Sequence, residues 1–199
     1  MADYRETDDL RTDKARPENH GTERFRKVIV IGCPGAGKST FARKLHELTG
    51  LPLYYLDRLF HREDRTVVSA DEFDRALGEI SSRDRWIIDG NYLRTMEMRL
   101  GACDTVFFLD LPVEVCLEGA ASRIGKPRED MPWTEPEFDP EFRRYITDFP
   151  KDQLPRIRAL LDRCKEGRTV ITLRSRDEMD HCLAEIGRGE NMIMTSGRQ

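Results

Sequence analysis

Five short runs of apolar residues recur along the chain, each rich in Val, Ile, Leu or aromatic side chains. They span residues 27–31, 53–56, 85–89, 105–110 and 168–173. Their apolar residues are continuous rather than alternating, which is typical of strands buried on both faces of a parallel sheet. Segments with helical periodicity separate them, at about 38–49, 69–82, 112–123, 139–165 and 176–186. This alternation predicts a three-layer α/β fold with a five-stranded parallel sheet.

Two breaks interrupt the helical pattern in the second half of the chain. Residues 124–138 combine a glycine and three prolines with many charges and show no periodicity, so we expect an irregular excursion from the core there. Within the helix predicted over 139–165, Pro150 and Pro155 should break or bend the axis, because proline removes a backbone donor and clashes with the preceding turn.

The length and composition suit a single domain. A chain of 199 residues can bury one substantial core, which we place at residues 25–186, with a short lid at about 124–138. Residues 1–24 are a polar N-terminal extension without the apolar segment of a signal peptide, and residues 187–199 are expected to be a flexible tail. No apolar run approaches membrane-spanning length, and the five scattered cysteines are typical of reduced thiols. We therefore expect a cytoplasmic protein that does not engage a membrane.

The charge distribution bears on two possible functions, nucleic-acid binding and phosphate transfer. A net charge of −4 argues against a wide nucleic-acid-binding surface, although a local basic groove stays open. Basic residues gather around the 124–138 segment and after residue 89, at Arg94, Arg99, Arg123, Lys126, Arg128, Arg143 and Arg144. A cationic flap of this kind would exclude water and stabilise charge on transferring phosphates. The alternative for each arginine is an ordinary solvated charge.

The most specific motif follows the first apolar run. Gly32-Cys33-Pro34-Gly35-Ala36-Gly37-Lys38-Ser39 matches G-x-x-x-x-G-K-[ST] between a predicted strand and a predicted helix, the context that a phosphate-binding P-loop requires. Its backbone N–H groups would hold the β-phosphate, Lys38 would reach the β- and γ-phosphates, and the Ser39 hydroxyl would ligate Mg²⁺. The motif predicts a bound nucleoside triphosphate.

Two carboxylates lie at the ends of predicted strands. Asp89 ends the third apolar run and Asp57 ends the second, and in α/β sheets the carboxyl edge faces the ligand crevice. Asp89 would hold Mg²⁺ through its water shell, opposite Ser39; a helix cap or turn is the alternative. Asp57 would orient an acceptor hydroxyl or take its proton; a turn carboxylate paired with Arg58 or Arg62 is the alternative.

These motifs together resemble adenylate kinase and related small P-loop kinases. The resemblance rests on the P-loop, on Asp57, on Ile-Ile-Asp-Gly followed by Arg94, and on Phe-Leu-Asp-Leu-Pro before a helix that leads to Arg123. The bacterial proteins named DNA topology modulation proteins, an adenylate-kinase-like family, are more closely similar. That similarity rests on Leu56-Asp57, Trp86-Ile-Ile-Asp-Gly-Asn-Tyr, Phe108-Leu-Asp-Leu-Pro and Leu173-Arg-Ser, and it covers residues 27–186.

The resemblance implies a nucleoside-monophosphate-kinase-like P-loop NTPase fold and a set of residue roles. The residues implied to bind ATP phosphates are Gly32, Pro34, Gly35, Ala36, Gly37, Lys38, Ser39 and Thr40. Asp89 would lie at the metal, Arg94 at the acceptor phosphate, Arg123 at the transferring group, and Arg174 beside adenine.

The chain departs from adenylate kinases near the acceptor. Phe60 stands where those enzymes place an arginine, and Asp89 and Arg94 are one residue farther apart. An acceptor smaller than a nucleotide, or one held partly by Tyr54, Phe60 and Tyr92, is therefore open.

The sequence thus predicts a phosphotransferase that depends on ATP and Mg²⁺ and moves the γ-phosphoryl group to a small nucleotide, nucleoside or metabolite. The alternative is a nucleotide-gated regulatory or nucleic-acid-associated protein with slow ATPase activity. Salt-dependent binding to duplex DNA would distinguish the second class, because phosphate contacts release counterions.

Overall fold

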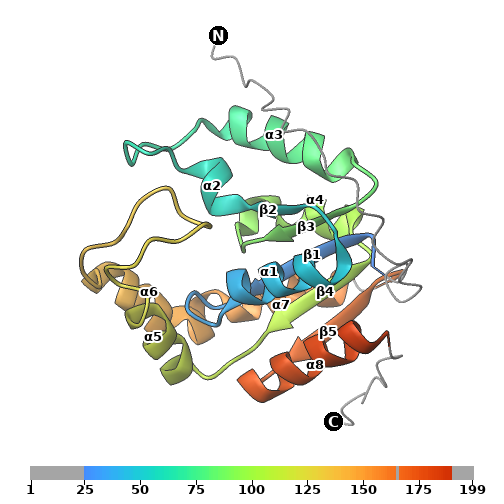
Figure 1. The fold of residues 1–199 in the computed structure, drawn as a ribbon. Coiled ribbons are helices and arrows are strands. Elements are labelled where there is room, and N and C mark those ends of the chain that lie inside the picture. Colours follow the sequence, from blue (N-terminus) through green and yellow to red (C-terminus); the bar gives the residue numbers. More distant parts are fainter. Residues whose placement is uncertain (1–24, 165, 190–199) are drawn as a thin grey trace, which may run out of the picture.

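The fold is built on a five-stranded parallel sheet. The computed structural model describes residues 25–164 and 166–189 (Figure 1). The predicted extension at 1–24 and most of the predicted tail at 187–199 lie outside them, but residues 187 and 188 of that tail belong to the last helix. The strand order is β2-β3-β1-β4-β5, and each neighbouring pair is parallel. The strands are β1 (Lys27–Gly32), β2 (Leu53–Tyr55), β3 (Trp86–Asp89), β4 (Thr105–Leu109) and β5 (Thr169–Leu173). This confirms the predicted fold class.

Eight helices connect or cover these strands in the described part of the chain. They are α1 (Lys38–Thr49), α2 (Leu56–Phe60), α3 (Ala70–Ser82), α4 (Leu93–Ala102), α5 (Val113–Ala121), α6 (Pro140–Asp152), α7 (Leu154–Arg163) and α8 (Arg176–Arg188). None of the described helices is both long enough and apolar enough to cross a membrane.

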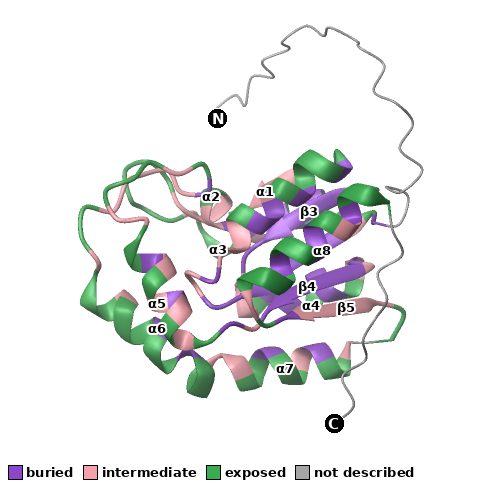
Figure 2. Ribbon diagram, turned by 60° about the horizontal axis from the view of Figure 1, so that its bottom comes forward, coloured by how far each residue is buried: buried purple, intermediate pink, exposed green. Residues whose placement is uncertain are grey.

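The helices form a layer on each side of the sheet. The α1 connection runs one way across the sheet, from β1 to β2, whereas the connections through α3, α4 and α7 run the other way. Right-handed crossovers place opposite directions on opposite faces. Accordingly, α1 contacts α8, and α4 contacts both α3 and α7. Buried residues concentrate in the strands and on the inward helix faces, and exposed residues lie outside (Figure 2).

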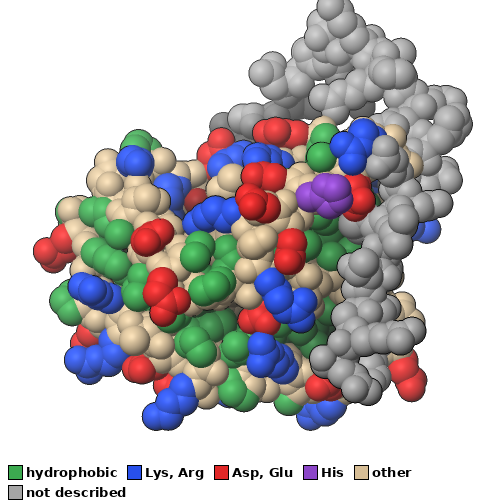
Figure 3. All heavy atoms as spheres, turned by 90° about the horizontal axis from the view of Figure 1, so that it is seen from below, with side chains coloured by type: hydrophobic (Ala, Val, Ile, Leu, Met, Phe, Trp, Pro, Cys, Tyr) green, Lys and Arg blue, Asp and Glu red, His purple; other side chains and the backbone are tan. Residues whose placement is uncertain are grey.

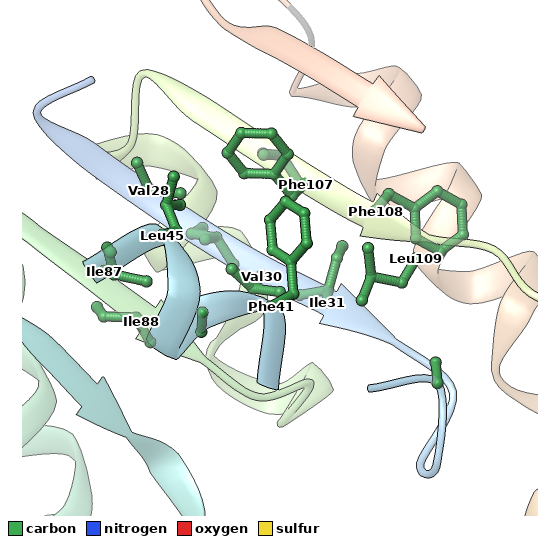
Figure 4. Close-up of a cluster of buried hydrophobic side chains, with 14 of the residues drawn as sticks. Val28, Val30, Ile31, Phe41, Leu45, Ile87, Ile88, Phe107, Phe108 and Leu109 are labelled. Carbon is green, nitrogen blue, oxygen red and sulfur yellow. The ribbon is translucent and has the colours of Figure 1, made fainter. Parts of the chain in front are cut away.

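The core is centred on β1, the middle strand. The side chains from Val28 to Ile31 are fully buried, as a strand covered on both faces requires. Phe41 and Leu45 of α1 pack onto this strand (Figure 4), and the Phe41 ring lies 4.9 Å from that of Phe107 on β4. The loop that leaves β1 carries the P-loop motif. The buried side chains of β1 and β4 hold the start of this loop in place.

Three features differ from the sequence prediction. The second apolar run does not end as a strand, because Leu56 already begins α2, so Asp57 lies in the first turn of that helix. Neither α2 nor α4 was predicted. The buried face of α4 includes Thr95 and Arg99, which hides its helical periodicity.

The predicted break in the long C-terminal helix is confirmed, at the Gln153 junction between α6 and α7.

Candidate active site

The P-loop crosses from the end of β1 to the start of α1. Gly35 and Gly37 have φ values of 85° and 94°, a left-handed conformation that favours glycine. Gly37 is the N-cap of α1, and its position supplies no side-chain cap to the helix. The first-turn N–H groups of α1 are therefore open to an anion, as at other phosphate-binding helix N-termini.

Helix α5 packs against this loop backbone to backbone. A Cβ at Gly35 would lie 1.9 Å from the Cys116 carbonyl oxygen, and a Cβ at Gly119 would lie 2.1 Å from the Gly35 oxygen. Both distances are shorter than any tolerated contact, so both positions require glycine. Gly119 thus holds the loop in place from a neighbouring helix, a role that no local sequence pattern indicated.

Gly119→Ala is expected to displace the P-loop and weaken ATP binding by about tenfold, with a loss of about 1–3 kcal/mol in stability from overpacking. Gly78→Ala is the matched control, because a Cβ there meets no atom of the described residues within 4 Å and the residue is also helical. Alanine at residue 78 should add about 0.5–1 kcal/mol of stability by removing a helical glycine. Calorimetric ATP binding and thermal unfolding measure both effects. Equal ATP affinity in the two variants would show that Gly119 does not position the loop.

Asn91 holds the start of the loop from the opposite side. Its Oδ1 accepts a hydrogen bond from the Gly32 N–H at 3.0 Å, and its Nδ2 donates to the Gly32 carbonyl at 2.8 Å. The segment around Asn91 is braced in turn by Arg99, which is fully buried and donates to the carbonyls of Gly90, Asn91 and Tyr92. Burial lowers the pKa of Arg99 to about 10, so it stays charged at neutral pH. Arg99 therefore supports the site without entering it.

Lys38, Ser39 and Asp89 meet beyond the loop. The Lys38 amine donates to the Cys33 carbonyl at 3.2 Å, and the Ser39 hydroxyl donates to Asp130 at 2.9 Å. Asp89 is 5% exposed, and its Oδ1 has no hydrogen-bond partner among the described residues. Burial raises the pKa of Asp89 to about 6; Asp57 and Asp130 also raise it, whereas Lys38 lowers it. A buried carboxylate oxygen of this kind suits a cation.

Asp57 faces the same region from α2. Its Oδ1 accepts a hydrogen bond from the Tyr92 hydroxyl at 2.9 Å, and Tyr92 has a φ of 36°, unusual for a non-glycine residue. Strain of this kind is often found at functional sites. The arginines proposed as alternative partners of Asp57 contact other groups: Arg58 donates to the Glu129 carbonyl and Arg62 pairs with Glu72. The carboxylate of Asp57 is thus directed toward Tyr92 and the cavity described next.

Two cavities meet at this point. The larger, of about 710 Å³, lies among α2, the start of α4, α6 and the segment between α5 and α6, and we call it the aromatic cavity. The smaller, of about 460 Å³, lies on the α5 and α8 side of the loop, and we call it the P-loop cavity. The residues that line both cavities are Lys38, Ser39, Arg123, Arg128 and Asp130. A group bound at this junction would be reachable from either side.

The segment between α5 and α6 makes contacts at the site that the sequence did not predict. It extends toward α2 (Figure 1), and the hydrogen bond from Ser39 to Asp130 ties it to the P-loop. Arg128 lies 3.7 Å from Asp130 and 3.5 Å from Glu135, with only 12% of its side chain exposed. Sequence reasoning named Arg128 as part of a flap but missed Asp130, because no pattern links residues so far apart in the chain.

The predicted arginines divide into two groups. Arg123 lines both cavities with its guanidinium 5.4 Å from the Phe142 ring, and burial lowers its pKa, with Arg128 adding to the effect. Arg94 instead binds Asp74 through two hydrogen bonds of 2.6 and 2.7 Å and lines neither cavity. The structure thus brings Arg123 to the junction and places Arg94 outside it. The acceptor role of Arg94 stays a prediction that would require release from Asp74.

The residues implied to bind nucleotide follow the same division. Arg174 lines neither cavity, and its backbone N–H donates to Glu178. Arg176, which the sequence did not single out, lines the P-loop cavity, and a Cβ at Gly119 would lie 3.1 Å from its guanidinium. Of the implied P-loop residues, Pro34 faces the aromatic cavity and Thr40 the P-loop cavity, whereas Ala36 is buried and could contribute only its backbone. The adenine contact of Arg174 also stays a prediction.

Comparisons with known proteins agree with the fold and the motif. The chain matches none of the known protein-family models. A stretch of 85 residues is 32% identical to adenylate kinases of Thermotoga petrophila and Thermotoga maritima, which is 42% of this chain and 38% of each relative. The match thus spans less than half the length of these curated relatives.

Two solved structures match over most of their length. A gluconokinase from Sinorhizobium meliloti is 15% identical, with a TM-score of 0.50 over 83% of this chain and 91% of that one. A shikimate kinase from Acinetobacter baumannii, solved with shikimate, is 20% identical, with a TM-score of 0.55 over 82% and 92%. These likenesses establish a P-loop kinase-like fold. The finer resemblance to the topology modulation proteins stays a prediction.

Proposed function

We propose that the protein transfers the γ-phosphoryl group of ATP to a small acceptor in a reaction that depends on Mg²⁺. The observation that carries this proposal is the junction of two cavities at Lys38, with the P-loop on one side and Asp57 on the other. A protein that only bound nucleotide would need no second cavity of about 710 Å³ at the phosphate end of the site. Transfer requires such an arrangement, because donor and acceptor must lie in line.

The P-loop cavity would hold the nucleotide. Backbone N–H groups of the loop and the open N-terminus of α1 would bind the β-phosphate. Lys38 would turn from the Cys33 carbonyl to the β- and γ-phosphates, and Arg123 would stabilise the charge on the transferring group. Arg176 would contact the nucleotide from the α8 side of the same cavity.

The residues present fit a magnesium ion. Oxygen ligands suit Mg²⁺. The Ser39 hydroxyl lies beside the Asp89 carboxylate, whose buried Oδ1 has no hydrogen-bond partner in the described part of the chain. Ser39 would bind the ion directly and Asp89 through a coordinated water. The ion would neutralise charge between the β- and γ-phosphate oxygens.

The aromatic cavity would hold the acceptor, with Asp57 at the reacting hydroxyl. In the transfer step the acceptor oxygen bonds to the γ-phosphorus, the bond from phosphorus to the β–γ bridging oxygen breaks, and ADP leaves. The hydroxyl proton passes to the Asp57 carboxylate. The hydrogen bond from Tyr92 to Asp57 orients that carboxylate, so positioning supplies most of the effect, as expected for phosphoryl transfer.

The nucleic-acid-associated alternative receives no comparable support. On the face shown in Figure 3, basic and acidic side chains are interspersed with hydrophobic ones and form no continuous basic surface. The basic residues of the P-loop cavity lie instead around the phosphate-binding loop.

The proposal is tested by following the label of γ-labelled ATP in the presence of Mg²⁺ and a pooled panel of nucleosides, nucleotides, sugars and other small hydroxyl compounds. A labelled organic product that forms with the wild-type protein and not with a Lys38→Ala variant would support a kinase. Label that reaches only inorganic phosphate, at a rate that no compound changes, would contradict it.

A further inference from the structure

The charges of the two cavities have opposite sign. Carboxylates predominate among the charged residues that line the aromatic cavity alone, namely Asp57, Asp89, Glu135, Glu137 and Asp139. Arg156 is the sole arginine or lysine among the described residues that line this cavity alone. The P-loop cavity is basic, with Lys38, Arg43, Arg123, Lys126, Arg128 and Arg176 against Glu129 and Asp130. The local potential therefore changes from positive to negative across the P-loop.

The cations at the junction are already engaged. Arg128 lies between Asp130 and Glu135, at 3.7 and 3.5 Å. Arg123 stacks on Phe142 and lies beside the P-loop, where the triphosphate would occupy it. Arg94, the residue expected to bind an acceptor phosphate, is held by Asp74 outside the cavity. An anionic acceptor would therefore face carboxylates with little compensating charge, which is unfavourable in a partly desolvated site.

Some carboxylates of the aromatic cavity are already bound by other groups of the protein. The charge of those that remain is still not positive. Asp89 belongs to the proposed metal site, Glu135 pairs with Arg128, and Asp139 caps α6 by accepting from the Glu141 N–H at 2.7 Å. Asp57 and Glu137 are the remaining carboxylates, and the positive charge of Arg156 offsets only one of them. The side of the cavity away from the P-loop is thus neutral to negative.

Aromatic side chains supply the rest of the lining. Tyr92, Trp133, Phe138 and Tyr145 face the cavity, and the His61 ring meets that of Trp133 edge to face at 5.0 Å. Aromatic faces attract apolar rings and also cations, because the π-cloud carries negative charge. Both the aromatic lining and the carboxylates disfavour an anion.

We infer, resting on the proposed function, that the phosphoryl acceptor is a non-anionic alcohol: a hydroxyl compound with an apolar or ring-shaped body that carries either no charge or a positive charge. Adenylate, gluconate and shikimate, the compounds in the names of the relatives, are all anions at neutral pH. The cavity of this chain selects against that class and in favour of their uncharged or amine-bearing counterparts.

The test compares matched acceptors that differ in charge. The pairs are adenosine with adenylate, glucosamine with gluconate, and methyl shikimate with shikimate, each offered with Mg²⁺ and γ-labelled ATP. We expect kcat/KM to favour the non-anionic member of a pair by about tenfold or more, the size expected when one negative charge enters a site lined by carboxylates. Preference for an anionic member would overturn this inference, while label transfer that still requires Lys38 would leave the proposed function standing. Transfer to none of these compounds, anionic or non-anionic, would count against both the inference about the acceptor and the proposed function.

A charge-reversal variant tests the cause of the preference. Glu137 is exposed, so Glu137→Arg should leave the fold intact while placing a cation at the cavity. We expect the preference for non-anionic acceptors to fall by about fivefold. Glu79→Arg makes the same change of charge on the exposed surface of α3 and should leave the preference unchanged. An equal preference in both variants would show that the cavity charge does not select the acceptor.

Discussion

Replacing Lys38 with alanine is expected to lower the rate of phosphoryl transfer by about 10³-fold while leaving the fold intact. The lysine would place a positive charge at the β- and γ-phosphates, and removal of one preorganised charge or donor costs about this much in comparable sites. Lys38 lines both cavities, and its amine makes one hydrogen bond, to the Cys33 carbonyl. The stability of the fold should therefore change little when the side chain is removed.

Lys44→Ala is the matched control for this variant. Lys44 lies on the same helix, and its amine pairs with Asp180 at 3.0 Å on an exposed surface, where an ion pair contributes little. Label transfer measures activity in both variants, and thermal unfolding measures the fold. If Lys38→Ala keeps its activity within tenfold of Lys44→Ala, the P-loop does not bind the transferring phosphates in the way proposed.

Asp89→Asn is expected to have two effects. It should stabilise the protein in the absence of metal, and it should lower the rate of phosphoryl transfer in the presence of Mg²⁺ by about 10²-fold. The loss of activity follows from the metal site, where groups that act through a coordinated water have effects of this size. The gain in stability follows from burial, which raises the pKa of Asp89 from the ordinary value of 3.8 to about 6. The folded state therefore disfavours the charged carboxylate that asparagine removes.

The sign of this effect determines its pH window. Because the folded pKa is the higher one, the stabilising contribution of Asp89 is fully present below pH 3.8 and is lost as the pH rises through about 6. The advantage of asparagine should therefore grow between these values and level off above pH 6, at roughly 3 kcal/mol at most.

Chemical denaturation in the presence of a chelator, at several pH values, measures the effect at Asp89. Asp74→Asn is the contrasting control, because its hydrogen bonds with Arg94 lower the pKa of that exposed carboxylate. That substitution should not stabilise the protein at neutral pH. A lower stability of Asp89→Asn at pH 8 would mean that the charged carboxylate is favourably paired in the folded state.

Local patterns in the sequence were sufficient for the sheet and for the P-loop. Continuous apolar runs identified all five strands. The central strands β1, β3 and β4 are covered on both faces and therefore do not alternate, whereas β2 and β5, at the edges of the sheet, are mostly half-buried. The P-loop motif placed Lys38 and Ser39 at the start of α1. Asp89 could be placed at the sheet edge because parallel strands end together. That one of its oxygens has no hydrogen-bond partner among residues 25–164 and 166–189 could be known only from the packing around it.

The parts that sequence reasoning missed depend on pairings between distant residues. Asn91 binds Gly32 across 59 positions of the chain, and Ser39 binds Asp130 across 91. Helix α4 escaped detection because its buried Arg99 binds backbone carbonyls rather than apolar neighbours. No periodicity reports such contacts.

The two arginines near the third strand show the same limit. The charge pattern alone treated Arg94 and Arg99 alike, as positive charges that follow Asp89, and only the family resemblance gave Arg94 a role at the acceptor phosphate. In the structure Asp74 binds Arg94 at the surface, whereas Arg99 is fully buried and braces the segment that holds the P-loop. Which arginine meets a carboxylate or a carbonyl depends on the packing of α3 against α4, and no local pattern contains that information.

In the proposed reaction, the γ-phosphoryl group bound at Lys38 passes to an acceptor in the aromatic cavity rather than to water. The most direct measurement follows the partition of label from γ-labelled ATP between organic product and inorganic phosphate as the acceptor concentration rises. We expect label to move from phosphate to product as the acceptor concentration rises, and we expect Asp57→Asn to slow product formation much more than it weakens ATP binding. Release of label to water at an unchanged rate at every acceptor concentration would show that the aromatic cavity does not hold the phosphoryl acceptor.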